Sequence, residues 1–245
     1  MNPSLSDILS DDIYGLTVLP VMAAPAEYKD QLQARITPLI TGIGPVEAAI
    51  SLTAALSRLE AMDSLPDLIV SLGSCGSREL EHARVYQASC VSYRDMDASP
   101  LGFEKGQTPL LDLPPILPLP CPIPGVPTAT LSTGANVVSG AGYDAIDAQM
   151  VDMETWALKR VAQTFGIPLI GLRGVSDGKS DLSRLEDWTG TLDQVDANLA
   201  FAWDLLSEVL TTQGLDALTE EDTSRLDHEG TNLQEAAQTS PPTDS

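Results

Sequence analysis

Two stretches decide the fold of this chain: V-D-M-E-T-W-A at 151–157 and G-I-P-L-I-G-L-R-G-V-S-D at 166–177. The first places Glu154 where a turn enters a helix, and the second places Asp177 where a buried strand runs out into a loop. Open α/β sheets bind their ligands at helix starts and at the carboxyl ends of strands. Each carboxylate alone is also compatible with a helix cap or an ordinary turn. Together they indicate a polar small-molecule site with acid or base chemistry.

Apolar runs around these stretches predict an α/β sheet with helices on both faces. The runs are rich in Val, Ile and Leu without strict alternation, which is typical of strands covered on both sides. Predicted strands occupy 16–22, 36–43, 67–72, 85–93, 128–132 and 169–175, and predicted helices occupy 46–62, 154–165 and 192–210. Strands that alternate with helices favour this class over an all-β or all-α fold.

Length and charge bound the domain organisation and the partners. A chain of 245 residues can form one large core, and we assign a single domain to 1–210. The segment 211–245 has eight acidic residues and one arginine, a composition that predicts a disordered acidic tail. A net charge of −22 argues against a nucleic-acid partner and against binding to anionic membranes.

Cysteine, histidine and proline usage gives further expectations. Three cysteines without a C-x-x-C spacing and two distant histidines predict neither a disulfide framework nor a metal site. Without a signal core or a membrane-length apolar run, we expect a cytoplasmic protein. The proline-rich segment 109–127 is expected to form an extended surface connector, because proline lacks the amide proton of a strand ladder.

Four glycine-containing turns follow predicted strands, at 41–45, 72–77, 132–136 and 175–178. Glycine lets a backbone approach a ligand closely or adopt a strained turn. A single such turn has many structural explanations. Four of them, combined with Glu154 and Asp177, predict a pocket lined by strand ends.

The order of these motifs resembles the purine nucleoside phosphorylase and nucleosidase superfamily. The resemblance covers about residues 16–190 and rests on Glu27, Gly134 and the segments 41–49, 73–76, 94–107, 152–154 and 173–177. Within the superfamily, the sequence is most similar to the branch that hydrolyses 5′-methylthioadenosine and S-adenosylhomocysteine. The resemblance implies a three-layer α/β/α fold with a central mixed sheet, like that of the phosphorylases and hydrolases. It also implies a homodimer that uses no cofactor.

The resemblance implies roles for particular residues. Asp177, oriented by Ser176, would protonate the purine N7 as the glycosidic bond breaks. Glu154 would bind the ribose hydroxyls, and Glu27 would activate the attacking water with help from Arg173 and Ser74. The remaining residues expected to contact substrate are Met153, Cys75, Gly76, Val137, Val138 and Leu101, the last in the pocket of a neighbouring subunit. Positioned carboxylates also suit the chemistry, since they stabilise oxocarbenium charge and supply a proton to the departing base.

Hydrolysis is favoured over phosphorolysis by one position. The phosphorylases of this superfamily have an arginine two residues before the glycine-rich 73–76 segment, where this chain has Ser71. An anionic nucleophile needs such fixed cations. The chain also departs from the family pattern at Ala135, Asp152 and Leu101. A further departure is at Val137 and Val138, which stand where the family usually has a stacking aromatic residue. A nucleosidase or phosphorylase for another purine nucleoside of the futalosine type, a non-catalytic nucleoside-binding protein and an unrelated α/β domain remain alternatives.

Overall fold

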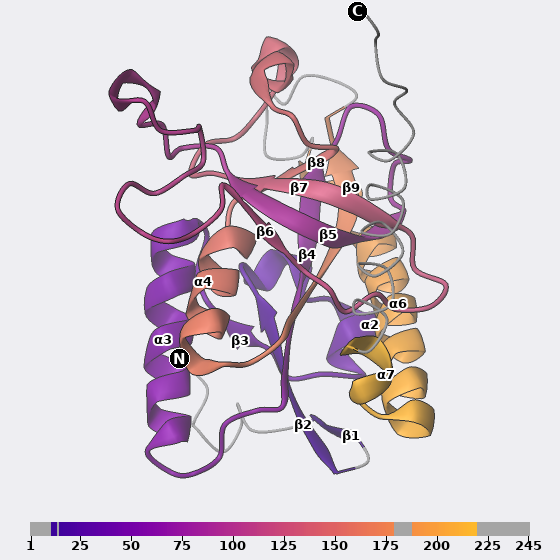
Figure 1. Cartoon of the computed structure of the whole chain (residues 1–245). Helices are drawn as coiled ribbons and strands as arrows, with labels where there is room; N and C mark the ends of the chain where they lie inside the picture. Colours follow the sequence, from indigo (N-terminus) through magenta and orange to yellow (C-terminus); the bar gives the residue numbers. More distant parts are fainter. Residues whose placement is uncertain (1–10, 14, 179–187, 220–245) are drawn as a thin grey trace, which may run out of the picture.

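The computed structural model describes residues 11–13, 15–178 and 188–219. Nine strands of this described part form one mixed sheet (Figure 1). They are β1 (Asp11–Ile13), β2 (Leu16–Met22), β3 (Leu39–Ile40), β4 (Leu68–Gly76), β5 (Val85–Tyr93), β6 (Ile116–Pro118), β7 (Thr128–Thr133), β8 (Met150–Asp152) and β9 (Leu169–Asp177). The central path runs β1-β2-β4-β8-β7-β5-β6. Because β9 pairs with both β4 and β5, part of the sheet closes on itself.

Helices cover both faces, which confirms the predicted three-layer α/β/α architecture. Helices α3 (Pro45–Glu60) and α4 (Thr155–Phe165) lie together on one side of the sheet, and α6 (Leu192–Gln213) lies with α2 (Asp30–Gln33) on the other (Figure 1). Each side has its own apolar core. One includes Leu52 and Leu56 of α3, and the other includes Leu199 and Leu206 of α6. The last described helix is the short α7 (Asp216–Thr219).

Most predicted elements are present, with shifted ends. The strands at 16–22 and 85–93 match β2 and β5. β4 and β9 continue past the predicted ends at Leu72 and Val175, so that Gly73–Gly76 and Asp177 are strand residues. The strand predicted at 36–43 was too long, because only β3 pairs, with Pro38 before it and Gly42 at φ 88° after it. The short strands β1 and β8 were missed.

The proline-rich segment is more than a surface connector, contrary to the prediction. Its β6 pairs antiparallel with β5 at the end of the central sheet path. From Leu117 to Ile123 the alternate residues are buried, whereas Pro118 and Pro120 face outward. Proline is compatible with an edge strand when its missing amide faces away from the ladder. The alternation of proline with apolar residues therefore marks an edge strand.

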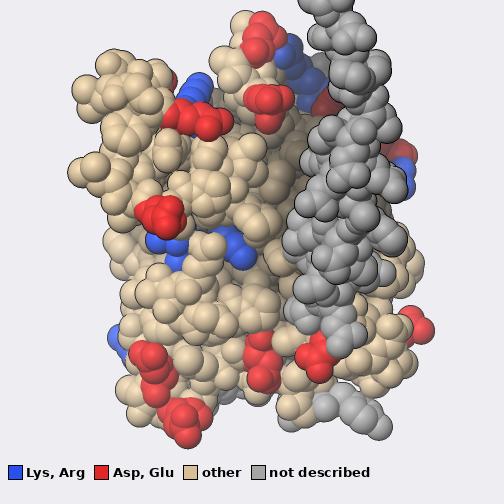
Figure 2. Space-filling model, in the orientation of Figure 1, with Lys and Arg blue, Asp and Glu red and all other residues tan. Residues whose placement is uncertain are grey.

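Helical structure continues past the domain boundary predicted at residue 210. α6 extends to Gln213, and α7 packs Leu218 into the core on that side. The rest of the predicted tail, 220–245, lies outside the described residues. On the face drawn in Figure 2, acidic side chains are spread over the surface, and Lys and Arg form only a few small groups. Among the described helices, none has the length and apolar character needed to cross a membrane.

Candidate active site

A cavity of about 530 Å³ lies where β4, β8 and β9 end. Small-molecule sites commonly have volumes of this size. The structure brings most of the predicted residues to its wall, namely Glu27, Ser74, Cys75, Gly76, Val137, Val138, Met153, Glu154 and Asp177. They come from distant parts of the chain and meet only through the sheet, which confirms that the glycine-rich strand ends line one pocket.

A β-bulge positions Asp177. β4 and β9 pair in parallel up to Cys75 opposite Val175, and the next pair is Gly76 with Asp177, so Ser176 is the extra residue. Bulges bend a strand and redirect its side chains, and they are frequent beside active sites. A side chain at Gly76 would collide with the hydroxyl of Tyr143 and the carboxylate of Asp177. Glycine at 76 is therefore required for the close approach of Asp177.

The carboxyl group of Asp177 is suited to donate a proton. Ser176 Oγ donates a hydrogen bond of 2.7 Å to Asp177 Oδ2, and the Asp177 side chain lines the cavity. Burial raises the pKa of Asp177, and the Ser176 hydrogen bond and the nearby His82 only partly oppose it. Desolvation favours the neutral acid because the charged form loses its water.

Glu27 faces the same cavity from the turn after β2. It belongs to the short helix Pro25–Glu27 and is 6% exposed. Its Oε1 accepts two hydrogen bonds, from the Ser74 amide at 2.7 Å and from Ser74 Oγ at 2.6 Å. Its Oε2 is buried and has no hydrogen-bond partner within the described part of the chain. Burial raises the pKa of Glu27, and the Ser74 hydrogen bonds and the charge of Arg173 lower it.

Glu154 is the residue immediately before α4, yet its side chain does not cap that helix. Its Oε1 instead accepts a 2.8 Å hydrogen bond from the amide of Gly44, which has φ 98° and precedes α3. The amide just before α3 has no partner within the helix and donates to a carboxylate instead. A negative charge at this position is stabilised by the positive end of the helix dipole. Burial, followed by the charge of Asp152, raises the pKa of Glu154 to about 7.

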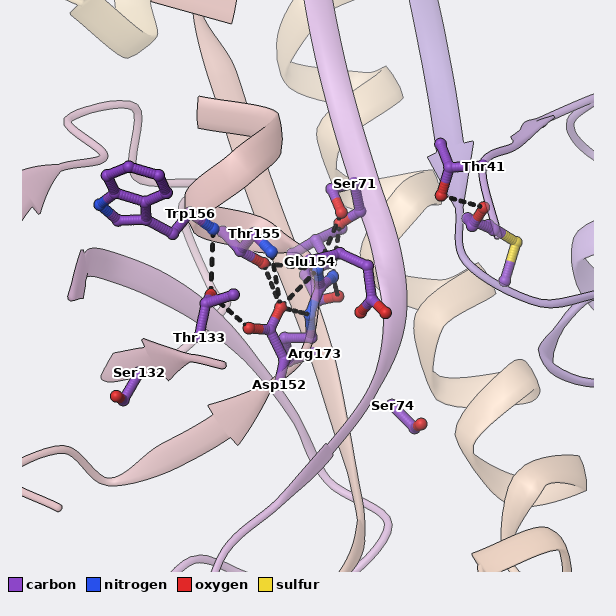
Figure 3. Close-up of polar contacts among 12 residues, drawn as sticks. Thr41, Ser71, Ser74, Ser132, Thr133, Asp152, Glu154, Thr155, Trp156 and Arg173 are labelled. Carbon is purple, nitrogen blue, oxygen red and sulfur yellow. Dashed lines mark hydrogen bonds and ion pairs between the residues drawn. The ribbon is translucent and has the colours of Figure 1, made fainter. Parts of the chain in front are cut away.

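Arg173 lies behind this wall in a saturated ion pair (Figure 3). Its Nε and Nη2 donate to Asp152 Oδ2 at 3.1 Å, and both side chains are almost completely buried. Its other hydrogen bonds go to the Ser71 and Leu172 carbonyls and to the Ser71 and Thr155 hydroxyls. Arg173 therefore acts on Glu27 through its charge and not through a hydrogen bond.

A second, very small cavity adjoins Glu27 on the Arg173 side. It measures about 10 Å³ and is lined by Glu27, Thr41, Ser71, Glu154, Arg173 and neighbouring residues. A space of this size holds about one water molecule. It is far too small for a phosphate ion.

Three predicted residues lie outside the cavity wall. Ser176 is 1% exposed and contacts Asp177 from behind, and Arg173 is buried as described. Leu101 lies on the short helix Ser99–Leu101 and is 77% exposed, so within one chain it does not reach the cavity. Val137 is also 67% exposed although it lines the cavity mouth.

Several residues of the site were missed. Trp188 lines the cavity from beyond the resemblance motifs, and no sequence signal indicated it. Arg94 lines it too, with its donors on Asn136 and on backbone carbonyls of Ser132, Gly134, Asn136 and Asp152. The sequence did contain a signal for the role of Asp152 as the ion-pair partner of Arg173. A buried strand arginine requires a buried acid, and Asp152 precedes Met153 in the motif already recognised.

The described residues contain no group of three or more His, Cys, Asp and Glu side chains arranged to bind a metal ion. The cavity wall itself presents carboxyl groups and the hydroxyl group of Ser74.

Comparisons with known proteins agree with this geometry. No family model matches the chain. A 5′-methylthioadenosine/S-adenosylhomocysteine nucleosidase from Staphylococcus aureus is 28% identical over 164 residues, which cover 58% of this chain and 70% of that protein. The sequence similarity to this nucleosidase supports a relationship to the purine nucleoside phosphorylase and nucleosidase superfamily.

Solved structures of the superfamily share the fold at low sequence identity. Futalosine hydrolase of Helicobacter pylori has a TM-score of 0.66 and 16% identity, covering 78% of this chain and 97% of its own. The 5′-methylthioadenosine/S-adenosylhomocysteine nucleosidase of the same bacterium, solved in complex with a pyrrolidinol compound, has a TM-score of 0.66 and 17% identity, covering 78% of this chain and 97% of its own. Both support the α/β superfamily fold and leave open which nucleoside this chain binds.

Proposed function

We propose that this nucleosidase, an N-glycosidic hydrolase, releases adenine from 5′-methylthioadenosine and S-adenosylhomocysteine. One observation carries the proposal. Two carboxyl groups whose pKa values are raised by burial, the half-buried Asp177 and the buried Glu27, line one cavity together with Glu154. The similarity to the Staphylococcus aureus nucleosidase supports the choice of substrates.

Asp177 is proposed as the general acid. A purine leaves with the electron pair of the glycosidic bond and needs a proton on the ring. Burial raises the pKa of Asp177, which favours the neutral form that can donate this proton. Positioned acids of this kind accelerate reactions by roughly 10²–10⁴-fold.

Glu27 is proposed as the base that activates water. Its Oε1 is occupied by Ser74, so the unpartnered Oε2 is the atom available to accept a proton from water. Water then adds to the sugar carbon as the purine departs. Glu154 accepts hydrogen bonds from the ribose hydroxyls, and Met153 lies beside the sugar. The oxygen nucleophile is incorporated into a free sugar.

Water is favoured over phosphate because the described cations near the cavity are already engaged. Arg173 and Arg94 donate to protein acceptors. The small cavity between Glu27 and Arg173, about 10 Å³, cannot hold a phosphate ion, which would have to lie in the large cavity beside Glu27. Placing a phosphate ion there would bring it against a carboxylate without a free guanidinium. The similarity to the Staphylococcus aureus nucleosidase favours thioalkyl nucleosides over a futalosine-type alternative.

We propose that the protein is a homodimer. Ile43 and Val137 line the cavity and are 54% and 67% exposed. Val46 at 65% and Ile50 at 59%, both on the same helix α3, and Leu101 at 77% are further exposed apolar side chains of the single chain. Exposed apolar residues that gather in one region indicate a contact surface, and a two-fold axis uses one surface twice. Leu101 would then reach the partner's pocket. A cytoplasmic location without nucleic-acid or membrane partners stays a prediction from composition.

Product analysis tests the reaction. Purified protein is incubated with 5′-methylthioadenosine in phosphate-free buffer and in phosphate buffer, and adenine and the sugar product are separated by chromatography. We expect adenine at equal rates in both buffers and a free methylthioribose sugar. Adenine formation that requires phosphate and yields a sugar phosphate would instead place the chain among the phosphorylases. Failure to release any purine from this or other purine nucleosides would refute the enzymatic proposal.

A further inference from the structure

We propose that Trp188 is a positioning residue for the water-activating base, and that it acts by fixing the hydroxyl of Ser74 toward Glu27. The inference rests on the proposed hydrolysis, in which Glu27 accepts a proton from water. Trp188 is not a member of any motif recognised in the sequence. It is the first described residue before α6 and lies 114 positions from Ser74.

Three hydrogen bonds form a directed chain. The indole Nε1 of Trp188 donates to Ser74 Oγ at 2.9 Å. Ser74 Oγ donates to Glu27 Oε1 at 2.6 Å, and the Ser74 amide donates to the same oxygen at 2.7 Å. An indole nitrogen only donates, whereas a serine hydroxyl has one proton and can accept as well. The direction of the chain is therefore fixed from Trp188 to Ser74 to Glu27.

This direction distinguishes the two oxygens of Glu27. When Ser74 Oγ accepts from the indole, its own proton remains for Glu27 Oε1. Oε1 then has two donors, and Oε2, which has none among the described residues, is the basic atom. Without the indole proton the hydroxyl can rotate toward other acceptors. Hydrogen bonds in such chains also polarise one another, so losing the first weakens the second.

The start of α6 is attached to the Glu27 segment at a second point. Asp196, 2% exposed, accepts hydrogen bonds from the backbone amides of Lys29 at 3.2 Å, Gln31 at 2.8 Å and Leu32 at 3.3 Å. These amides lie within five residues after Glu27 in the chain. One region of the molecule thus fixes the backbone after Glu27 through Asp196 and the side chain of Glu27 through Trp188 and Ser74.

Other charged or titratable groups also act on Glu27 and remain in place when Trp188 is changed. They are Arg173 on β9, Glu154 before α4 and the buried thiol of Cys75 on β4. Arg173 lowers the pKa of Glu27, whereas burial raises it. A shift of the Glu27 titration in a Trp188 variant consequently reports the Ser74 hydrogen bond and not a change in these neighbours.

Trp188→Phe tests the inference, since it keeps an aromatic ring and removes only the indole donor. Losing a neutral hydrogen bond of about 1 kcal/mol corresponds to roughly a 5-fold loss. We expect that loss in kcat, a smaller change in KM, and an acidic limb of the kcat–pH profile displaced to higher pH. Trp156→Phe is the matched control, because that indole stacks on Tyr93 at 4.4 Å, and its kcat and pH profile should equal those of the parent.

Ser74→Ala provides the second arm. It removes the acceptor of the indole proton, so Trp188→Phe should cause no further loss in the Ser74→Ala background. Fully additive losses, or an unchanged kcat and pH profile in a folded Trp188→Phe variant, would overturn the inference. If that variant does not fold, an acidic limb in Ser74→Ala at its parental position would overturn it instead. A parent protein without nucleosidase activity is a different outcome, because it contradicts the proposed function itself.

Discussion

Replacing Glu154 with glutamine should make the protein more stable and less active, and the gain in stability should depend on pH. Glutamine keeps an oxygen that can accept from the Gly44 amide but has no charge to bury. The pKa of Glu154 rises from 4.5 to about 7 on folding, chiefly through burial. One pKa unit corresponds to about 1.4 kcal/mol, so the ionised group costs the folded protein about 3 kcal/mol.

The sign of the pH dependence follows from proton linkage. Between pH 4.5 and about 7 the folded protein retains the proton of Glu154 while the unfolded chain releases it. The stability of the parent therefore falls as pH rises through this window. Glutamine removes this titration. The variant should gain about 2–3 kcal/mol more in unfolding free energy near pH 8 than near pH 5.

Denaturant titrations of both proteins at the two pH values measure this difference. Glu208→Gln on α6 is the matched control, since Glu208 is exposed and its replacement should change stability equally at both values. Equal gains for Glu154→Gln at the two pH values would refute the argument that this carboxylate is desolvated. In activity assays the variant should discriminate less between ribosyl and 2′-deoxyribosyl substrates, because the carboxylate is proposed to accept the ribose hydroxyls.

Two further predictions concern the acid and the subunit contact. Asp177→Asn should lower kcat by roughly 10²–10⁴-fold while nucleoside binding, measured by calorimetry, stays close to that of the parent, because asparagine keeps the shape without a proton to give. A near-normal rate would exclude Asp177 as the acid. Leu101→Asp should weaken both dimer formation in light scattering and affinity for thioalkyl nucleosides, since a charge would replace an exposed apolar contact. A parent that is fully active as a monomer would contradict the dimer.

The parts of the fold that depend on long apolar segments could be predicted from the sequence. β2, β5, α3 and α4 follow from uninterrupted apolar runs and helical periodicity. The three residues of β8 were invisible to this reasoning, because so short a strand has no period of its own and forms only by pairing with β7 and β4. β6 was hidden by its prolines, whose meaning depends on lying at an edge.

The site shows the same division between local and long-range information. Glu27, Glu154 and Asp177 were predicted because each lies in a recognisable motif. Trp188 could not be found, since its contact with Ser74 spans 114 positions and depends on how α6 returns to the sheet. Ion pairing between Arg173 and Asp152 likewise depends on tertiary structure, because β8 and β9 both pair with β4.

All hydrogen-bond donors of Arg173 are engaged by protein acceptors, which explains why the three acids of the cavity wall that have no cationic partner favour hydrolysis. Asp152 neutralises that arginine, which leaves Glu27, Glu154 and Asp177 on the wall without a free described cation. Burial raises the pKa of all three, so the empty site does not favour negative charge. The transition state of glycosidic cleavage supplies the positive charge that these carboxyl groups lack in the free protein, because the sugar becomes positively charged. Interactions that strengthen only in the transition state accelerate the chemical step, and a neutral nucleoside gains them without a competing anion.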